Sequence, residues 1–184
     1  PSQTVVQGGV RFQGNEVQLW RSLPSLQNVA GEIAFSERGF QLNSLQGGFL
    51  GGPMLLSGGT QKDGTTQVRA EGSVSVDGNS RGFNTAPMRR LAKKMTGSTR
   101  YSALVRVRGQ GPEITVDSTL AGLSLDFPAP LGKSQSDTMP LRFGLSPLVS
   151  PDSTVQQEEI RINLGRAMSG RYLLQRVNSR SAPW

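Results

Sequence analysis

The chain has 184 residues, of which 35% are hydrophobic and 18% charged, and it contains neither cysteine nor histidine. These absences exclude disulfides and thiolate metal sites, and they remove the common nucleophile–base pairs and the usual zinc ligands. Lysine and arginine number 20 against 13 aspartates and glutamates, a formal net charge of +7. Such a charge favours polyanionic partners, meaning nucleic acid, lipopolysaccharide or an anionic membrane, unless neighbouring segments of a longer protein compensate for it.

The first part of the chain predicts short strands separated by glycine-containing turns. Residues 9–20 contain two alternating runs around Gly14-Asn15, which predicts a hairpin. Val29, Ile33 and Phe35 share one parity, and a turn at 37–39 then leads into a returning segment. These features indicate consecutive antiparallel neighbours.

Residues 67–77 give the clearest strand signal. Small or apolar residues at 68, 70, 72, 74 and 76 alternate with polar ones, so one face of this strand is dry and the other is wet. Asp63-Gly64 is a strong turn signal just before it. The density of glycine between residues 47 and 72 indicates bulges, tight turns or a strongly curved sheet, because glycine is unfavourable inside flat strands.

Between residues 85 and 96 the period changes to that of a short amphipathic helix. Met88, Leu91, Ala92 and Met95 fall on one side, with Thr85 as the expected N-cap and Gly97 as the expected stop. The other side carries the basic residues Arg89, Arg90, Lys93 and Lys94. Two interpretations stay open: the helix contacts an anionic surface, or it is a plug whose apolar side covers the edge of the sheet.

Strand signals resume after the helix, at 101–108, 114–116, 123–127, 141–145, 159–164 and 171–176. We therefore expect one all-β unit over residues 1–184, with strands in 1–83, a helix in 84–97 and further strands in 98–184. The carboxylates fall mostly in turns or on wet strand faces, and no phosphate-binding loop is present. The pattern predicts a sheet with one apolar face and no catalytic residues. The chain starts without methionine, and we expect it to be a segment of a longer protein.

Residues 115–133 resemble a segment typical of large AsmA-like envelope proteins, within them the YhdP branch. The resemblance rests on STLAGL at 118–123 followed by FPAPLGK at 127–133. The order of LPSL at 23–26, VAGEI at 29–33, LGGP at 50–53 and the strands at 64–72 is also similar. The resemblance covers most of residues 8–145 and assigns no catalytic residue.

This resemblance implies a long, twisted, curved antiparallel meander that forms a half-open groove, called a repeating β-groove. It also implies a periplasmic location in a parent protein anchored in the inner membrane. Such a groove carries phospholipid acyl chains between the two membranes without catalysis. The implied partners are phospholipid, an anionic membrane surface and flanking segments of the parent chain, with neither a cofactor nor nucleic acid.

The candidate groove residues are the alternating apolar ones. They are Ile33, Phe35, Leu42, Met54, Leu56, Val74, Val76, Val105, Val107, Ile114, Val116, Leu125, Leu141, Phe143, Ile160 and Ile162. An apolar stripe facing a groove and one packed in a core have the same period of two. Two other functions therefore remain open: a structural scaffold whose sheet closes without binding lipid, and a polyanion-binding module centred on Arg89, Arg90, Lys93 and Lys94.

Overall fold

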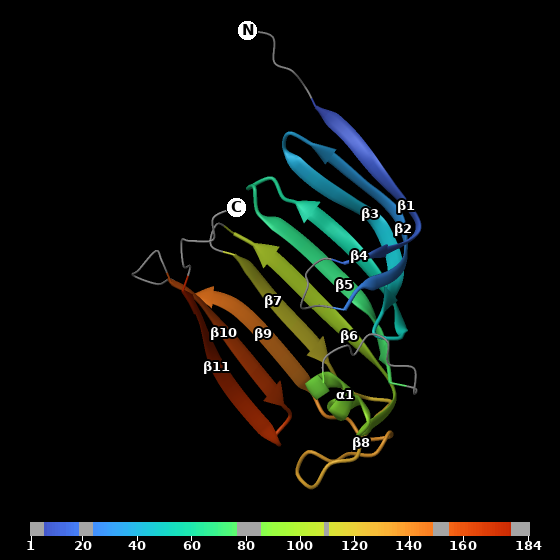
Figure 1. Cartoon of the computed structure of the whole chain (residues 1–184), viewed down its shortest axis with the longest axis vertical. Coiled ribbons are helices and arrows are strands. Elements are labelled where there is room, and N and C mark those ends of the chain that lie inside the picture. The colour runs from blue at the N-terminus through green and yellow to red at the C-terminus, as the bar shows by residue number, and fades with distance from the viewer. Residues whose placement is uncertain (1–5, 19–23, 77–85, 109–110, 149–154, 178–184) are drawn as a thin grey trace.

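The computed structural model describes residues 6–18, 24–76, 86–108, 111–148 and 155–177. Within these ranges there are eleven strands and one short helix (Figure 1). The elements are β1 (Gln7–Val17), β2 (Leu26–Ser36), β3 (Gly39–Phe49), β4 (Gly52–Thr60), β5 (Thr66–Ser75), α1 (Ala86–Ala92), β6 (Met95–Val107), β7 (Pro112–Ser118), β8 (Leu123–Leu125), β9 (Leu141–Leu148), β10 (Val155–Leu164) and β11 (Met168–Val177).

The strands form one antiparallel meander. Their order is β1-β2-β3-β4-β5-β6-β7-β9-β10-β11, and the short β8 pairs with the beginning of β6. β1 and β11 are the two edges, so the sheet is open and not closed into a barrel. The predicted all-β meander is thereby confirmed.

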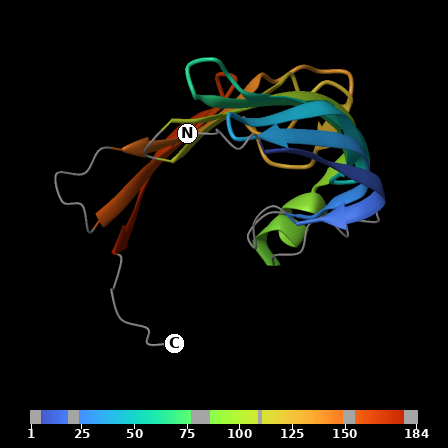
Figure 2. The ribbon, with the colours of Figure 1, turned by 90° about the horizontal axis from the view of Figure 1, so that it is seen from above.

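The register places the apolar side chains of successive strands on one face of the sheet. One row crosses six strands, each residue opposite the next: Val68, Val105, Ile114, Leu145, Ile160 and Tyr172. In Figure 2 the sheet curves around the side that carries α1. We call this apolar side the concave face and the opposite side the convex face.

Bulges and glycines accompany this curvature. The register shifts within the β1–β2, β2–β3 and β3–β4 pairs, where an extra residue bends the strand. Gly58 in β4 has φ +115°, and a Cβ at this position would overlap the carbonyl oxygen of Gln67 in β5. Only glycine allows the two backbones to approach so closely there.

α1 covers the lower end of the concave face as drawn in Figure 1. Its Ala92 is buried with residues of β8 and of the segment before β8 in what we call the end cluster, which comprises Val76, Ala92, Leu120, Leu123 and Leu125. Val74, Leu141 and Leu164 of the sheet pack against this cluster. A second group, the N-terminal cluster, consists of Leu26, Val29, Leu45 and Met54, where β1–β4 curl over. No helix in the described ranges is long and apolar enough to cross a membrane.

The hairpin predicted for residues 9–20 is wrong. β1 continues through Gly14, which has φ +90°, and pairs with β2 on both sides of it. The side-chain oxygen of Asn15 accepts a hydrogen bond from the backbone N–H of Gln13 at 2.9 Å. This local bond stabilises a bulge in place of a turn, so the strand does not reverse. Trp20 lies outside the described residues.

The helix is confirmed but is shorter than its apolar period indicates. It ends at Ala92, and Met95 already pairs with Leu125 as the first residue of β6. Gly97 therefore lies inside a strand and does not stop the helix, and a Cβ there would overlap the carbonyl oxygen of Gly122. Pairing with β8 outweighs the helical period at this point. The expected N-cap, Thr85, lies outside the described residues.

Candidate functional site

The register brings the sequence-predicted groove residues of the sheet to one side. Every candidate on β2–β7, β9 and β10 belongs to the concave face, as cross-strand pairs such as Ile33 with Leu42, Val105 with Ile114 and Ile162 with Phe143 demonstrate. The two candidates outside these strands, Val76 and Leu125, are buried in the end cluster. The strands therefore build a continuous apolar surface.

Parts of this surface are covered and parts are open. Met54, Val76 and Leu125 are less than a tenth exposed, because the two clusters enclose them. Large apolar side chains elsewhere on the concave face are exposed: Val10 by 48%, Phe35 by 42%, Val107 by 39%, Tyr172 by 64% and Leu174 by 40%. Exposed apolar side chains that share one concave face mark a binding surface more than a finished core.

The convex face is mostly polar, although Leu55 and Leu173 are exposed there, and it contains ion pairs between strands. Nε of Arg142 lies 2.7 Å from Oδ1 of Asp117, which joins β9 to β7. Arg11 and Glu32 join β1 to β2 at 3.4 Å. Both pairs are exposed and screened by water, so neither contributes much to stability. They do identify the convex face as the one that faces water.

Glu159 on β10 is a buried carboxylate that sequence reasoning missed. Its side chain is 1% exposed, and it pairs with Arg161 on the same strand at 2.5 Å and with Arg171 on β11. The two arginine side chains are 65% and 62% exposed. A charge is tolerated out of water when it is paired and hydrogen-bonded in this way. No local signal distinguishes Glu159 from Glu158, because the burial arises from the neighbouring strand.

Tyr101 lies across the middle of the concave face. Its ring meets that of Phe49 edge to face, with the centroids 6.4 Å apart. A Cβ at Gly72 would lie 3.2 Å from the Tyr101 hydroxyl, so the tyrosine side chain occupies the space that the glycine leaves. The hydroxyl is buried without a hydrogen-bond partner among the described residues. Burial raises the pKa of Tyr101 to about 12.

Lys133, the last residue of the FPAPLGK sequence, is also buried. Its Nζ donates hydrogen bonds to the carbonyl oxygens of Leu123 and, at 2.9 Å, Ser134. Burial lowers its pKa, while the nearby Asp137 opposes that shift. Lys133 thus anchors the segment after β8 to the end cluster, and this structural role accounts for a charged residue in the motif.

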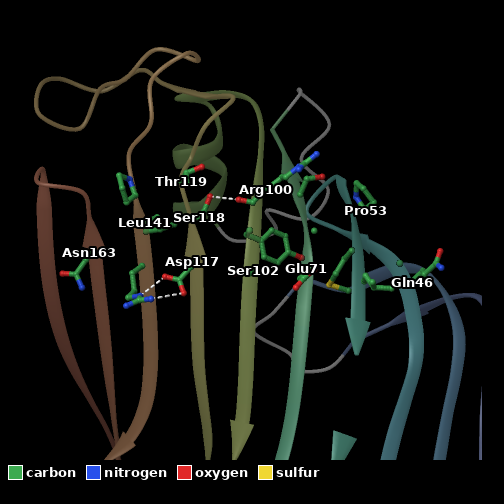
Figure 3. A pocket seen from close by; sticks show the side chains of 18 of the residues that line it. Gln46, Pro53, Glu71, Arg100, Ser102, Asp117, Ser118, Thr119, Leu141 and Asn163 are labelled. Atoms are coloured by element: carbon green, nitrogen blue, oxygen red, sulfur yellow. Dashed lines mark hydrogen bonds and ion pairs between the residues drawn. The ribbon is translucent and has the colours of Figure 1, made fainter. Parts of the chain in front are cut away.

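The convex face also carries an open hollow of about 1380 Å³, shown in Figure 3. It crosses β3–β7, β9 and β10, and polar and charged residues such as Glu71, Arg100 and Asp117 line it together with apolar ones such as Pro53, Leu55 and Pro140. The Arg142–Asp117 pair borders it, and the Ser118 hydroxyl donates to the carbonyl oxygen of Arg100 at 2.7 Å. The hollow therefore combines paired charges with apolar side chains and is not a purely polar surface.

The candidate basic residues are all exposed: Arg89 and Arg90 lie on α1, and Lys93 and Lys94 directly follow it. Lys94 forms an ion pair with Asp126 at 2.9 Å, and Arg89 also has an interaction within the molecule. Leu91 is 49% exposed, although the helical period places it on the apolar side. The helix buries Ala92 and not Leu91, so its contact with the end cluster is narrower than predicted. The described ranges contain no group of three or more acidic residues that could hold a metal ion.

Comparison with known proteins supports the sequence resemblance. No curated protein and no solved structure matches the chain significantly. A family model described as "YhdP protein" matches residues 1–182, nearly the whole chain. The chain therefore belongs to the YhdP family of envelope proteins.

Proposed function

We propose that this chain is a non-enzymatic segment of a lipid-transfer protein, and that its concave face shields phospholipid acyl chains. In this proposal the parent protein is anchored in the inner membrane and spans the periplasm, so that lipid moves between the inner and outer membranes. Membership of the YhdP family, which is not a known enzyme family, supports this reading.

The observation that carries the proposal is the open concave face itself. Its exposed apolar side chains come from β1, β2, β6 and β11, strands distributed along the whole sheet. Removing apolar surface from water gains about 25 cal/mol per Å², so a bound acyl chain and this face stabilise each other. The alternative of a closed scaffold has less support, because the edge strands β1 and β11 do not pair with each other.

The experiment compares aspartate substitutions on the two faces. Phe35→Asp with Val107→Asp places two charges on the concave face, and Leu55→Asp with Leu173→Asp places two on the convex face. All four side chains are between 39% and 58% exposed, so neither double variant disrupts a buried core. Lipid that copurifies with each protein is extracted and quantified by mass spectrometry, and folding is followed by circular dichroism.

We expect the concave-face variant to lose most of its bound lipid and the convex-face variant to retain it. Charges on an acyl-binding surface are costly, because they lose hydration when lipid covers them. If both variants are folded and carry equal lipid, the assignment of the concave face is wrong.

A further inference from the structure

We propose that Arg90 of α1 and Lys93, the residue directly after α1, bind the phosphate of an anionic phospholipid at the lower end of the concave face beside α1, which we call the mouth. This inference rests on the proposed function, since it concerns the headgroup of a lipid whose acyl chains lie in that face. It names the class of lipid that the segment prefers.

The first observation is that the strands place their cations away from the concave face. Every lysine or arginine on a strand whose side chain the structure describes belongs to the convex face. They are Arg11, Arg69, Arg100, Arg106, Arg142, Arg161 and Arg171. Among the strand residues whose side chains the structure describes, none therefore brings a cation to the concave side; Arg176, which the register of β11 assigns to that side, lies beyond the described side chains.

α1 and the residue that follows it supply cations on the concave side. The helix lies on the concave side, because its Ala92 packs in the end cluster against Val74 and Leu141 of the sheet (Figure 2). At 100° per residue, Arg90 points about 160° away from Ala92, and Lys93 lies on the flank of the helix. Both side chains are exposed, and neither forms an ion pair with any described residue.

The helix holds these cations in a defined place. The backbone N–H of Asp126 donates to the carbonyl oxygen of Lys94 at 2.8 Å, and that of Val76 donates to Gly97 at 2.9 Å. The Lys94–Asp126 ion pair adds a side-chain contact. α1 is thus fixed to β8 at one end, although it is only seven residues long.

The position suits an amphipathic ligand. When the acyl chains of a phospholipid lie on the concave face, its phosphate group lies in water at the mouth, beside α1. The exposed Leu91, between the two cations in sequence, gives the glycerol end of the lipid an apolar contact. Among the other exposed cations, Arg38 and Lys62 lie in the β2–β3 and β4–β5 turns, at the ends of the strands away from α1, whereas Arg166 lies in the β10–β11 turn at the same end as α1. An anionic headgroup near α1 is therefore favoured over a zwitterionic one, by about fivefold for each cation it contacts.

The test measures lipid preference in two variants with the same change of charge. Arg90→Gln with Lys93→Gln removes the cations of α1, and Arg69→Gln with Arg106→Gln removes two exposed cations from the convex face. Wild type and variants are incubated with vesicles of equal parts phosphatidylglycerol and phosphatidylethanolamine and then re-isolated. The bound lipids are extracted and their ratio is measured by mass spectrometry.

We expect wild type and the convex-face variant to be enriched in phosphatidylglycerol, and the α1 variant, which lacks two cations that contribute about fivefold each, to lose about 25-fold of that enrichment while still carrying lipid. An unchanged ratio in a lipid-loaded α1 variant overturns the inference and leaves the proposed function standing. An equal loss in both variants also overturns it, because net charge then explains the preference. Wild-type protein that takes up no lipid refutes the proposed function and this inference together. If the α1 variant only floats less with the vesicles and keeps its lipid ratio, α1 contacts the membrane surface and no headgroup site exists.

Discussion

Because Glu159 is buried, we expect removal of its two arginine partners to lower the free energy of unfolding more than removal of its own charge does. Replacing Arg161 and Arg171 with methionine keeps most of the aliphatic stems but leaves a carboxylate that is 1% exposed without a counter-charge. Breaking a buried pair in this way typically costs about 3–5 kcal/mol. Glu159→Gln leaves two arginines that are more than 60% exposed and can be solvated, so we expect a cost of about 1–2 kcal/mol.

Urea unfolding followed by far-ultraviolet circular dichroism measures both free energies. Asp117→Asn serves as a control, because its pair with Arg142 is exposed, and its loss should cost no more than about 1 kcal/mol. If Glu159→Gln destabilises the protein as much as the double arginine variant does, burial of the carboxylate is not what determines the energy, and the reasoning fails.

Three further predictions concern single residues. Tyr101→Phe removes a buried hydroxyl without a described partner, so unfolding in urea at pH 7 should show a gain of about 1 kcal/mol, and a loss would reveal an unrecognised hydrogen bond. Because burial raises the pKa of Tyr101 from 10.0 to about 12, the folded state holds this proton more tightly, and wild type should lose stability relative to that variant as the pH rises from 10 to 12. Gly97→Ala should lower the free energy of unfolding by about 3–5 kcal/mol, because the new Cβ would overlap the Gly122 carbonyl oxygen. Gly14→Ala, at φ +90° but with open space around it, should lower that free energy by only about 1–2 kcal/mol. Equal shifts in the melting temperatures of the two variants would contradict this difference. Lys133→Met should lower the free energy of unfolding by about 1–3 kcal/mol, since two carbonyl oxygens lose their hydrogen-bond donor. The measured effect is a lower melting temperature.

The period of two predicted the strands and their apolar face well. The alternation from Val68 to Val76 corresponds to β5, and Asp63-Gly64 to its turn. In an antiparallel meander each strand packs beside its neighbour in sequence, so local patterns carry most of the fold. Glycine predicted part of the curvature, as Gly58 illustrates, but the bulge in β3 falls at Asn43 and Ser44, where the glycine pattern gives no signal.

Features set by non-local pairing could not be predicted. Met95 continues the helical period of α1, yet it joins β6 because Leu125, thirty residues later, pairs with it. The sequence pattern predicts a turn at Gly14, but the residues on both sides of it pair with β2 and belong to one strand. Burial of Glu159 depends on β11, and exposure of Leu91 depends on how little of α1 the end cluster covers. The role of the candidate groove residues remains a prediction, since their placement on one face is compatible with a dry core as well as with lipid.

The central claim, that lipid lies on the concave face, is tested most directly by photo-crosslinking along β6. A photoreactive amino acid is placed in turn at positions 104, 105, 106 and 107, and lipid attached after irradiation is measured by mass spectrometry. Val105 and Val107 belong to the concave face, and Leu104 and Arg106 to the convex face. We predict that lipid attaches at 105 and 107 and not at 104 or 106. Attachment without this alternation, or only at 104 and 106, would contradict the account.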